Sequence, residues 1–438
     1  MSIKEIAGEQ GQENNFLLES LEMSEKKSSP APGKISYEPQ TMLSFEEVKK
    51  LDEKYILDTY SRMPVCFAYG SGEFLYDEKG TEYIDFLSGI AVTALGHAHA
   101  DLVETLLHQA DLIWHSSNLF YNQQQALLAR ALIEISFPGK VFFANSGAEA
   151  NEAAIKFIRS YGLEKNKSKI IALKNGFHGR TFGAMSVTGQ KKIHDGFGPL
   201  LENITFIEPN DIKSLEAALS DDTAGLIMEP VLGEGGIIPL TREFLQKSRE
   251  LCYKHKALLV FDEIQTGMGR TGNYFAWQEF NIAPDVMTLA KGLGGGFPIG
   301  AMVVAEKYKD VFHSGMHGST FGGNHLAAAI GYEVIRLIEY HKILENVRTM
   351  GSHLMEKLWT LKDKYPDKVV EVRGKGLLVG LVLKEGIQAR PLVQKALEKH
   401  LVIGRAAENV LRFAPPLILR EKTMDKAFTK IEELVKEI

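Results

Sequence analysis

The sequence predicts an α/β protein with a mostly parallel sheet of seven strands and a second, smaller α+β domain. Two observations support this fold class. Between residues 96 and 322, short apolar runs alternate with amphipathic helical stretches, as expected for crossovers between parallel strands. Beyond residue 322 the apolar spacing takes the helical period and is interrupted by three strand-like runs. Because 45% of the 438 residues are hydrophobic, the chain has enough apolar material for a large core.

This pattern divides the chain into four segments. Residues 1–40 are rich in Glu, Gln, Ser, Lys and Gly, and we predict that they form a mobile tail. Residues 41–95 contain two short apolar runs around a polar turn, which predicts a hairpin over residues 74–86. We expect this segment to build the smaller domain together with residues 323–438, and residues 96–322 to form the larger domain.

Seven apolar runs in the larger domain are predicted strands. In chain order they are Val141–Ala144, Ile170–Leu173, Ile204–Ile207, Gly225–Met228, Leu258–Phe261, Val286–Leu289 and Ala301–Ala305. A parallel sheet that is covered on both faces binds its ligands outside the carboxyl ends of its strands. The polar residues that follow these runs are therefore the first candidates for a functional site.

Beyond residue 322 the sequence predicts four helices and three strands. The helices are Leu326–Glu339, Ile343–Leu361 and the segments near Pro391–His400 and Thr423–Ile438, and the strands are Val369–Val372, Leu377–Leu383 and Val410–Phe413.

Charge and cysteine content exclude several classes of function. Fifty basic and 56 acidic side chains give a net charge of −6. This balance lacks the excess of positive charge that would favour binding to nucleic acid or to an anionic membrane surface. Cys66 and Cys252 form neither a CxxC pair nor a cluster, so we predict no disulfide and no metal site. No stretch reaches the roughly 18 uncharged apolar residues of a membrane span, and no signal peptide is evident. We therefore expect a soluble, cytoplasmic protein.

The first predicted strand of the larger domain leads into a phosphate-binding sequence. Val141–Ala144 is followed after one residue by Ser146, Gly147 and Ala148, and then by an Ala-rich helix. Such a junction directs backbone N–H groups and the positive end of the helix dipole at one point, which suits an anion such as phosphate. The alternative is that Ser146 only caps the helix.

Two further strands end in an acid and in a lysine. Leu258–Phe261 is followed directly by Asp262, and Val286–Leu289 is followed after one residue by Lys291 and a Gly-rich loop. A buried carboxylate needs a partner, which is either a helix N-terminus, a lysine, or the protonated ring nitrogen of a cofactor. Desolvation lowers the pKa of a lysine and favours the neutral amine that Schiff-base chemistry requires.

Four more motifs complete the pattern. They are Phe177–Thr181, Glu229–Gly236, Gly318–Asn324 and Asn409–Pro416. With these motifs in this order, the chain resembles the fold-type I, class III aminotransferases from about Tyr60 to its C-terminus. The resemblance implies pyridoxal 5′-phosphate (PLP) as the cofactor and transamination as the reaction. A PLP-binding transcription regulator is excluded, because the acidic tail is no DNA-reading domain.

The resemblance also implies which residues hold the phosphate of the cofactor. Ser146, Gly147 and Ala148 are expected to bind it through the helix N-terminus. Thr320 would reach the phosphate of the neighbouring subunit's cofactor, as in the family. The resemblance therefore implies a homodimer with shared active sites.

The remaining cofactor residues are expected around the ring. Phe177 and Ile264 would lie against its two faces, and Gln265 would bind the ring oxygen. Asp262 would keep the ring nitrogen protonated, so that the cofactor acts as an electron sink. Lys291 would hold the cofactor covalently and then carry the proton between the two reacting carbons. Lys291 and Asp262 are thus the predicted catalytic residues.

Two arginines look like the carboxylate readers of this family. Arg180 and Arg412 each offer a guanidinium fork, which binds a carboxylate through two N–H groups. Glu234 would neutralise Arg412 when the substrate has one carboxylate only, unless it is a plain surface ion pair. Ser319 is a further predicted substrate-binding residue. Ile90 stands where ornithine aminotransferases place a tyrosine, so the chain resembles the acetylornithine aminotransferases instead.

This resemblance implies N-acetylornithine and 2-oxoglutarate as substrates, in arginine biosynthesis. Ornithine, N-succinylornithine, N-succinyl-diaminopimelate and 4-aminobutyrate stay open as alternatives, because a hydrophobic pocket discriminates modest changes only about 10–200-fold. The pair of Glu234 and Arg412 implies two alternating substrates, which disfavours an aminomutase or racemase of the same fold. His97, His99 and His178 lie beside the motifs, and we interpret them as packed or hydrogen-bonded rather than catalytic.

Overall fold

The computed structural model describes residues 42–438 and separates into two units, of which the first ends at Ile56. The described part of this first unit is helix α2 (Phe45–Tyr55), which begins with a capping box. The predicted mobile tail, residues 1–40, lies outside the described residues. The second unit, Leu57–Ile438, contains all other elements. The boundaries predicted at residues 96 and 323 lie within this unit and stay predictions.

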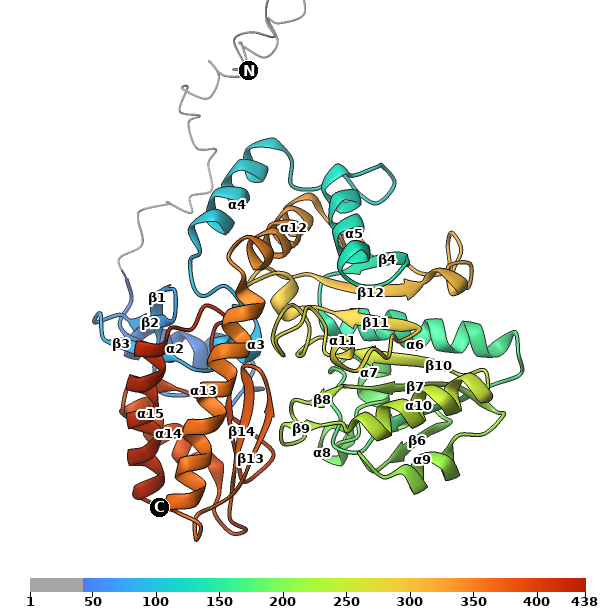
Figure 1. Cartoon of the computed structure of the whole chain (residues 1–438). Helices are drawn as coiled ribbons and strands as arrows, with labels where there is room; N and C mark the ends of the chain where they lie inside the picture. The colour runs from blue at the N-terminus through green and yellow to red at the C-terminus, as the bar shows by residue number, and fades with distance from the viewer. Residues whose placement is uncertain (1–41) are drawn as a thin grey trace, which may run out of the picture. The chain divides into compact units, whose positions relative to one another are not determined.

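Seven strands form a mixed sheet in the second unit, and each coincides with a run predicted from the sequence (Figure 1). They are β4 (Gly139–Ala144), β5 (Lys169–Leu173), β6 (Ile204–Ile207), β7 (Thr223–Met228), β10 (Leu258–Asp262), β11 (Val286–Leu289) and β12 (Gly300–Ala305). Their order is β4-β12-β11-β10-β7-β5-β6, and only β12 is antiparallel to its neighbours. The predicted α/β fold with a mostly parallel seven-stranded sheet is confirmed.

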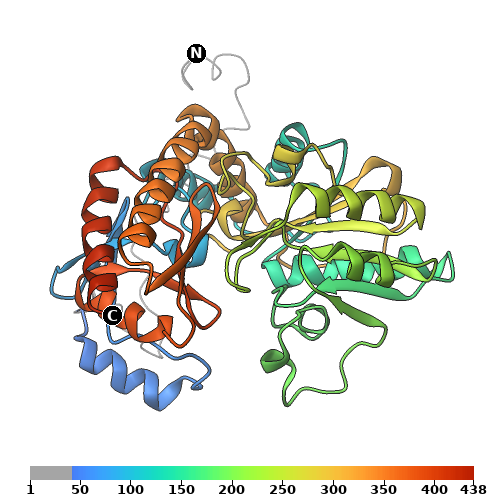
Figure 2. The ribbon, with the colours of Figure 1, turned by 60° about the horizontal axis from the view of Figure 1, so that its bottom comes forward.

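Helices cover both faces of this sheet (Figure 2). Helix α6 (Gly147–Leu163) covers one face, where its side chains share a core cluster with Val260 of β10. Helix α10 (Arg242–Lys254) covers the other face, where its side chains share a core cluster with Phe261. Strands β7, β10 and β11 are buried along their whole length. Burial on both faces explains why these strands read as continuous apolar runs rather than as alternating patterns.

Further helices surround the large sheet. They are α4 (Ala100–Leu112), α5 (Gln123–Ile135), α7 (Phe182–Ser186), α8 (Lys191–His194), α9 (Ile212–Ala218), α11 (Trp277–Phe280) and the 3₁₀ turns η3 (Lys291–Leu293) and η4 (Glu306–Tyr308). Within residues 42–438, no helix combines the length and the apolar character needed to cross a membrane.

Two four-stranded sheets and four long helices complete the second unit (Figure 1). The sheet β1-β2-β3-β15 consists of β1 (Phe67–Ser71), β2 (Phe74–Asp77), β3 (Glu82–Asp85) and β15 (Leu401–Val402). The sheet β13-β14-β17-β16 consists of β13 (Val369–Lys375), β14 (Leu378–Leu383), β17 (Val410–Phe413) and β16 (Gly404–Ala406). The helices are α12 (His325–Tyr340), α13 (Ile343–Lys364), α14 (Ala389–Glu398) and α15 (Glu421–Lys436).

Sequence-distant segments meet in the first of these sheets. Strands β2 and β3 form the predicted hairpin, and β15 pairs in parallel with β3. A short two-stranded ribbon, β8 (Val231–Leu232) and β9 (Ile238–Pro239), lies apart from the three sheets. The N-terminal hairpin and the C-terminal segment thus share one sheet.

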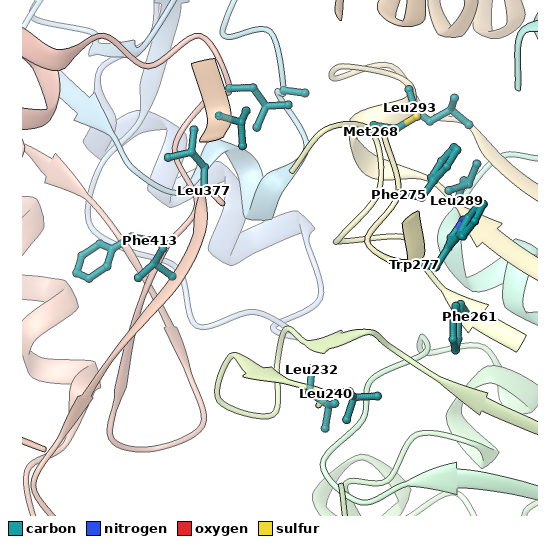
Figure 3. Close-up of a cluster of buried hydrophobic side chains, with 14 of the residues drawn as sticks. Leu232, Leu240, Phe261, Met268, Phe275, Trp277, Leu289, Leu293, Leu377 and Phe413 are labelled. Atoms are coloured by element: carbon teal, nitrogen blue, oxygen red, sulfur yellow. The ribbon is translucent and has the colours of Figure 1, made fainter. Parts of the chain in front are cut away.

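Part of the main core lies beside the carboxyl end of β11 (Figure 3). Phe275, Trp277 and Leu289 lie together there, and each is at most 7% exposed. Truncation of a buried aromatic side chain to Ala typically costs about 3–5 kcal/mol. This packing holds in place the strand ends from which Asp262 and Lys291 project.

Candidate active site

A cavity of about 440 Å³ opens at the carboxyl ends of β4, β10 and β11. Nine of the predicted site residues line it, namely Ser146, Gly147, Ala148, Phe177, Arg180, Asp262, Ile264, Gln265 and Lys291. Open α/β sheets bind their ligands at this position. The predicted Ser319, Thr320, Glu234 and Arg412 do not line this cavity.

One end of the cavity is an anion-binding helix terminus. Ser146 caps helix α6, because its hydroxyl accepts a hydrogen bond from the backbone N–H of Glu149 at 3.2 Å. The N–H groups of Gly147 and Ala148 belong to the first helical turn, which has no intrahelical acceptors. A Cβ atom on Gly147 would lie 2.9 Å from Ile264, so only glycine fits between the helix and the cavity wall. This end of the cavity suits a phosphate group.

Asp262 ends β10 at the other end of the cavity and is only 2% exposed. Its Oδ1 atom accepts the backbone N–H of Ile264 at 3.0 Å. Its Oδ2 atom accepts Nδ2 of Asn151 at 2.8 Å and faces Nδ1 of His178 at 2.7 Å. The partners of this buried carboxylate are therefore a histidine and an amide rather than a lysine or a helix N-terminus. His178 is hydrogen-bonded, as we interpreted it from the sequence.

A second buried acid lies close to His178. Glu229 accepts hydrogen bonds from the backbone N–H groups of Phe177 at 2.8 Å and Gly233 at 3.0 Å. Burial raises the pKa of Glu229 to about 7, although the charge of His178 opposes this shift. Within residues 42–438, Nε2 of His178 is buried without a hydrogen-bond partner. Asp262, His178 and Glu229 all line the cavity, and, against the effect of burial, the charges of both carboxyl groups raise the pKa of His178.

Lys291 follows β11 and opens the turn η3 with a left-handed backbone, at a φ of 45°. Burial lowers the pKa of its ammonium group, and the charge of Arg412 adds to this effect, while the charge of Glu234 opposes it. A lowered pKa increases the fraction of neutral amine near neutral pH. Lys291 is therefore the candidate nucleophilic amine of the cavity.

The polar atoms of the cavity fit PLP. Oε1 of Gln265 is buried without a hydrogen-bond partner, so it needs a donor from a bound group. The helix N-terminus at Gly147 suits the phosphate, and Asp262 suits a protonated ring nitrogen. Lys291 also lines the cavity, so its amine could serve as the attachment point for PLP. When bound, PLP supplies an electron sink for the reaction at the substrate carbon.

An ion pair adjoins the cavity beside Lys291. Arg412, on β17, is 4% exposed and donates from Nη1 to the carboxylate of Glu234 and, at 3.4 Å, to the carbonyl oxygen of Gly233. Burial raises the pKa of Glu234, but the charge and hydrogen bond of Arg412 outweigh it and hold that pKa below its ordinary value. Nε of Arg412 is buried without a partner, so the guanidinium keeps a free donor for a ligand.

Arg180, the second arginine predicted to bind a carboxylate, is more exposed than Arg412. Arg180 is exposed, and its guanidinium lies 5.9 Å from the ring centre of Phe177. It lines the cavity from its solvent side, where a substrate enters. The two arginines therefore offer one open binding group and one that is already paired.

Ser319 and Thr320 line a separate hollow of about 380 Å³. Asn145 borders both hollows and donates from Nδ2 to the hydroxyl of Ser319 at 3.1 Å. Ser319 in turn accepts the backbone N–H of Gly322 at 3.0 Å. Within the described chain, Thr320 is thus placed outside the cavity of its own subunit.

A strained turn adjoins the cavity and has no signal in the sequence. Residues 88–91 all have φ between 52° and 68°, so they form one left-handed turn that includes the predicted specificity residue Ile90. Left-handed backbone costs roughly 1–2 kcal/mol for each residue other than glycine. The buried Asp85 holds the turn, because its Oδ1 accepts the N–H groups of Leu87 and Ser88, and its Oδ2 lies 2.7 Å from Nε2 of His97.

Sequence reasoning therefore missed several members of the site. His178 and Glu229 stand inside quoted motifs, and their burial beside Asp262 was the missing information. Asn151 lies one turn into α6, on the buried face of that helix, and its Oδ1 accepts the hydroxyl of Thr288 at 2.8 Å. A helical wheel of α6 was the signal that could have identified Asn151 as an inward-facing polar residue.

The fold and this cavity are those of a PLP-dependent enzyme. The family model of the class-III aminotransferases matches residues 55–435. The chain is 48% identical to an acetylornithine aminotransferase from Caldanaerobacter subterraneus subsp. tengcongensis, over 88% of this chain and 98% of that protein. The chain therefore belongs to the class III aminotransferases, and its cofactor is pyridoxal 5′-phosphate.

Solved structures agree with this family. The ornithine aminotransferase of Toxoplasma gondii superposes with a TM-score of 0.87 at 30% identity, covering 90% of this chain and 96% of that one. The N-acetylornithine aminotransferase of Stenotrophomonas maltophilia gives a TM-score of 0.77 at 35% identity, covering 89% and 98%. Of these two structures, the ornithine aminotransferase superposes better, whereas the N-acetylornithine aminotransferase has the higher sequence identity.

Proposed function

We propose that the chain transfers the terminal amine of N-acetylornithine to 2-oxoglutarate, giving N-acetylglutamate 5-semialdehyde and glutamate in arginine biosynthesis. The observation that carries this proposal is the pairing of Glu234 with Arg412 beside Lys291, while Arg180 stays open at the cavity. Identity to relatives with the acetylornithine name supports it further. We weigh identity above superposition, because specificity depends on side chains and the backbone is shared throughout the family.

The residues around Lys291 suit proton transfer at carbon. Its amine, with a lowered pKa, can take the proton from the substrate carbon that carries the transferred nitrogen. Asp262, held by His178 and Asn151, keeps a proton on the ring nitrogen of the cofactor. General acid–base catalysis of this kind typically contributes about 10²–10⁴-fold.

Arg180 and Arg412 would bind different groups of the two substrates. N-acetylornithine has one carboxylate, which we assign to Arg180, and an uncharged acyl amide, which can approach Arg412 while Glu234 neutralises it. Glutamate has two carboxylates, so its α-carboxylate must displace Glu234 to reach Arg412. Nη1 of Arg412, which pairs with Glu234, is the donor that the arriving carboxylate would take over.

We also propose a homodimer with shared active sites. Thr320 lines a hollow outside the cavity of its own subunit, so it is free to complete the phosphate site of a second copy. Large apolar side chains are exposed near this hollow in the chain segment that includes Trp114, Leu119, Phe120 and Tyr121. Exposed apolar patches of this kind are typical of subunit interfaces. The other partners are small molecules, and the free cysteines Cys66 and Cys252 favour the reducing cytoplasm.

One comparison of substrates tests the proposed activity. The purified holoenzyme is given 2-oxoglutarate and, at equal concentrations, N-acetylornithine, N-succinylornithine, N-succinyl-diaminopimelate, ornithine or 4-aminobutyrate, and glutamate release is measured. We expect the highest kcat/KM with N-acetylornithine. A higher value for ornithine or 4-aminobutyrate would refute the proposed substrate, and a higher value for a succinylated amine would reassign the acyl group.

A further inference from the structure

Three metal-ligating side chains meet outside the catalytic cavity, where helices α4 and α12 pack against each other. His99 is the N-cap residue of α4, Asp101 lies in the first turn of α4, and His341 is the C-cap residue of α12. Each side chain offers one ligand atom, and these atoms lie within 4.8 Å of one another. The sequence analysis predicted no metal site, because the two cysteines form neither a CxxC pair nor a cluster. His341 lies far along the chain from His99 and Asp101.

The three side chains have unused binding capacity. Nδ1 of His99 is buried without a hydrogen-bond partner, which is a destabilising arrangement unless another group satisfies it. In the part of the chain that the structure describes, the ring of His341 and the carboxylate of Asp101 also form no hydrogen bond. The nearest cation to compete for Asp101 is Arg336, but its guanidinium donates to Glu333 at 2.8 Å.

The ligand chemistry selects the class of ion. Two imidazoles and one carboxylate match the three-ligand zinc sites, in which water takes the fourth position. Hard cations such as Mg²⁺ prefer sites made of oxygen ligands alone. The carbonyl end of α12 adds a partial negative charge at His341, and the carboxylate of Asp101 offsets the positive end of α4.

The three ligand atoms need to move only slightly closer together to bind one ion. Zn–N bonds of about 2.0–2.1 Å place two ligand atoms of a tetrahedral ion about 3.4 Å apart. The rings of His99 and His341 have centroids 6.1 Å apart and are inclined by 59°, and the ring of His341 also lies edge-on to Tyr340 at a centroid distance of 5.0 Å. His341 is exposed at the end of its helix, so its side chain can rotate towards the other two.

We propose that His99, Asp101 and His341 bind a divalent transition-metal ion of the zinc class, which links the start of α4 to the end of α12. The site is independent of the proposed substrate, because it lies outside the catalytic cavity. A bound ion stabilises the folded state by mass action, so its occupancy raises the thermal midpoint of the protein. The link also satisfies the buried nitrogen of His99.

Zinc binding to the full-length, untagged holoenzyme tests this proposal. Protein that was stripped with a chelator is titrated with Zn²⁺ by calorimetry and by equilibrium dialysis. We expect one tightly bound ion per subunit, a rise in the thermal midpoint on binding, and no binding of Mg²⁺ at the same concentration. His341→Gln and Asp101→Asn should each weaken zinc binding at least tenfold, since each removes one of three ligands.

A matched control separates this site from general histidine binding. His108→Gln removes an exposed imidazole from the same helix α4 but outside the cluster, and it should leave zinc affinity unchanged. Because His341 is exposed, its variant should fold, which thermal unfolding without metal verifies. The proposal is overturned if the wild type binds no zinc, if His341→Gln loses less than tenfold in affinity, or if His108→Gln loses as much.

Discussion

Nδ1 of His178 lies 2.7 Å from Oδ2 of Asp262, and both side chains are at most 2% exposed. Burial alone lowers the pKa of His178, but the hydrogen bond and the charge of Asp262 outweigh burial and raise that pKa. The contact therefore favours a protonated imidazole. We propose that this contact orients Asp262 towards the ring nitrogen of PLP.

His178→Gln should weaken this function of Asp262. A hydrogen bond to a charged group contributes about 1.5–3 kcal/mol, so we expect turnover to fall by roughly 10- to 100-fold. Retention of PLP during dialysis, followed by absorbance, should fall as well. As a control, His255→Gln removes a surface pair with Asp221, where Nδ1 lies 2.8 Å from Oδ1, and should change neither readout. Unchanged cofactor retention in His178→Gln would contradict this role.

Lys291→Ala should abolish covalent attachment of PLP while the protein still folds. The helix N-terminus at Gly147 and the carboxylate of Asp262 remain, so the cofactor should still bind without a covalent bond. Treatment with borohydride should then fix no cofactor to the protein, as mass spectrometry can measure. Turnover within about tenfold of the wild type would refute the assignment, because acid–base catalysis alone is typically worth about 10²–10⁴-fold.

Thr320→Ala tests the shared active site. If Thr320 binds the phosphate of the second subunit's cofactor, its loss should cost about 1.5–3 kcal/mol of cofactor affinity. Mixed dimers of Thr320→Ala and Lys291→Ala subunits should then contain one site with both defects and one with neither. Titration of such dimers with PLP should reveal sites of wild-type affinity. Their absence would place Thr320 in the site of its own subunit.

The stability of the protein should depend on pH through Glu263. Burial raises the pKa of this carboxyl to about 7, although hydrogen bonds from Thr266, Ala276 and Trp277 oppose the shift. The folded state therefore binds more protons than the unfolded state between the ordinary pKa of 4.5 and about 7. Its contribution to stability falls as pH rises through this window, by about 3 kcal/mol at most.

Glu263→Gln should remove this dependence, because an amide resembles the neutral carboxyl at every pH. The measurement is the thermal midpoint of both proteins at several pH values from 4.5 to 8. We expect the wild type to lose stability relative to the variant as pH rises to about 7, and the difference to level off as the carboxyl becomes fully ionised. A difference that does not change with pH would mean that Glu263 ionises with an ordinary pKa.

The strands of the large sheet could be predicted from their apolar runs, and β7, β10 and β11 read as continuous runs because they are buried on both faces. The two-residue strands β8, β9 and β15 could not, because they are too short for any periodicity. The left-handed turn at residues 88–91 is held by local hydrogen bonds from Leu87 and Ser88 to Asp85, and His97 contacts the same carboxylate. Only Gly89 in that turn has the intrinsic preference for such a backbone.

The residues of the candidate site also divide into those that could be predicted from the sequence and those that could not. Asp262 ends an apolar strand and Lys291 follows another after one residue, so chain topology alone brings them to one edge of the sheet. Glu229 directly follows β7, so its place at this edge could be predicted in the same way. His178 reaches the site from a loop, and a loop's path is not encoded in periodicity. The importance of His178 and Glu229 follows from their burial beside Asp262.

The ion pair of Glu234 with Arg412 leads to the sharpest prediction on specificity. Because Arg412 is nearly buried and keeps one unpaired donor, removal of Glu234 should free it for the α-carboxylate of glutamate. A charge-assisted hydrogen bond contributes about 1.5–3 kcal/mol, so Glu234→Ala should shift relative kcat/KM towards glutamate by roughly 10- to 100-fold. Arg412→Ala should do the reverse, damaging use of glutamate far more than use of N-acetylornithine.

Single-turnover half-reactions separate these effects, because each amine can be followed alone by the absorbance change of the lysine-bound cofactor. The ratio of the two half-reaction rates is the decisive quantity, since a general loss of stability or of cofactor would slow both equally. Arg373→Ala is a suitable control, as it removes a partly buried arginine of β13 that pairs at 3.0 Å with Glu371 of the same strand. We expect Glu234→Ala to change this ratio by at least roughly 10-fold. If the ratio stays within about twofold of the wild type, Glu234 is only a structural ion-pair partner of Arg412.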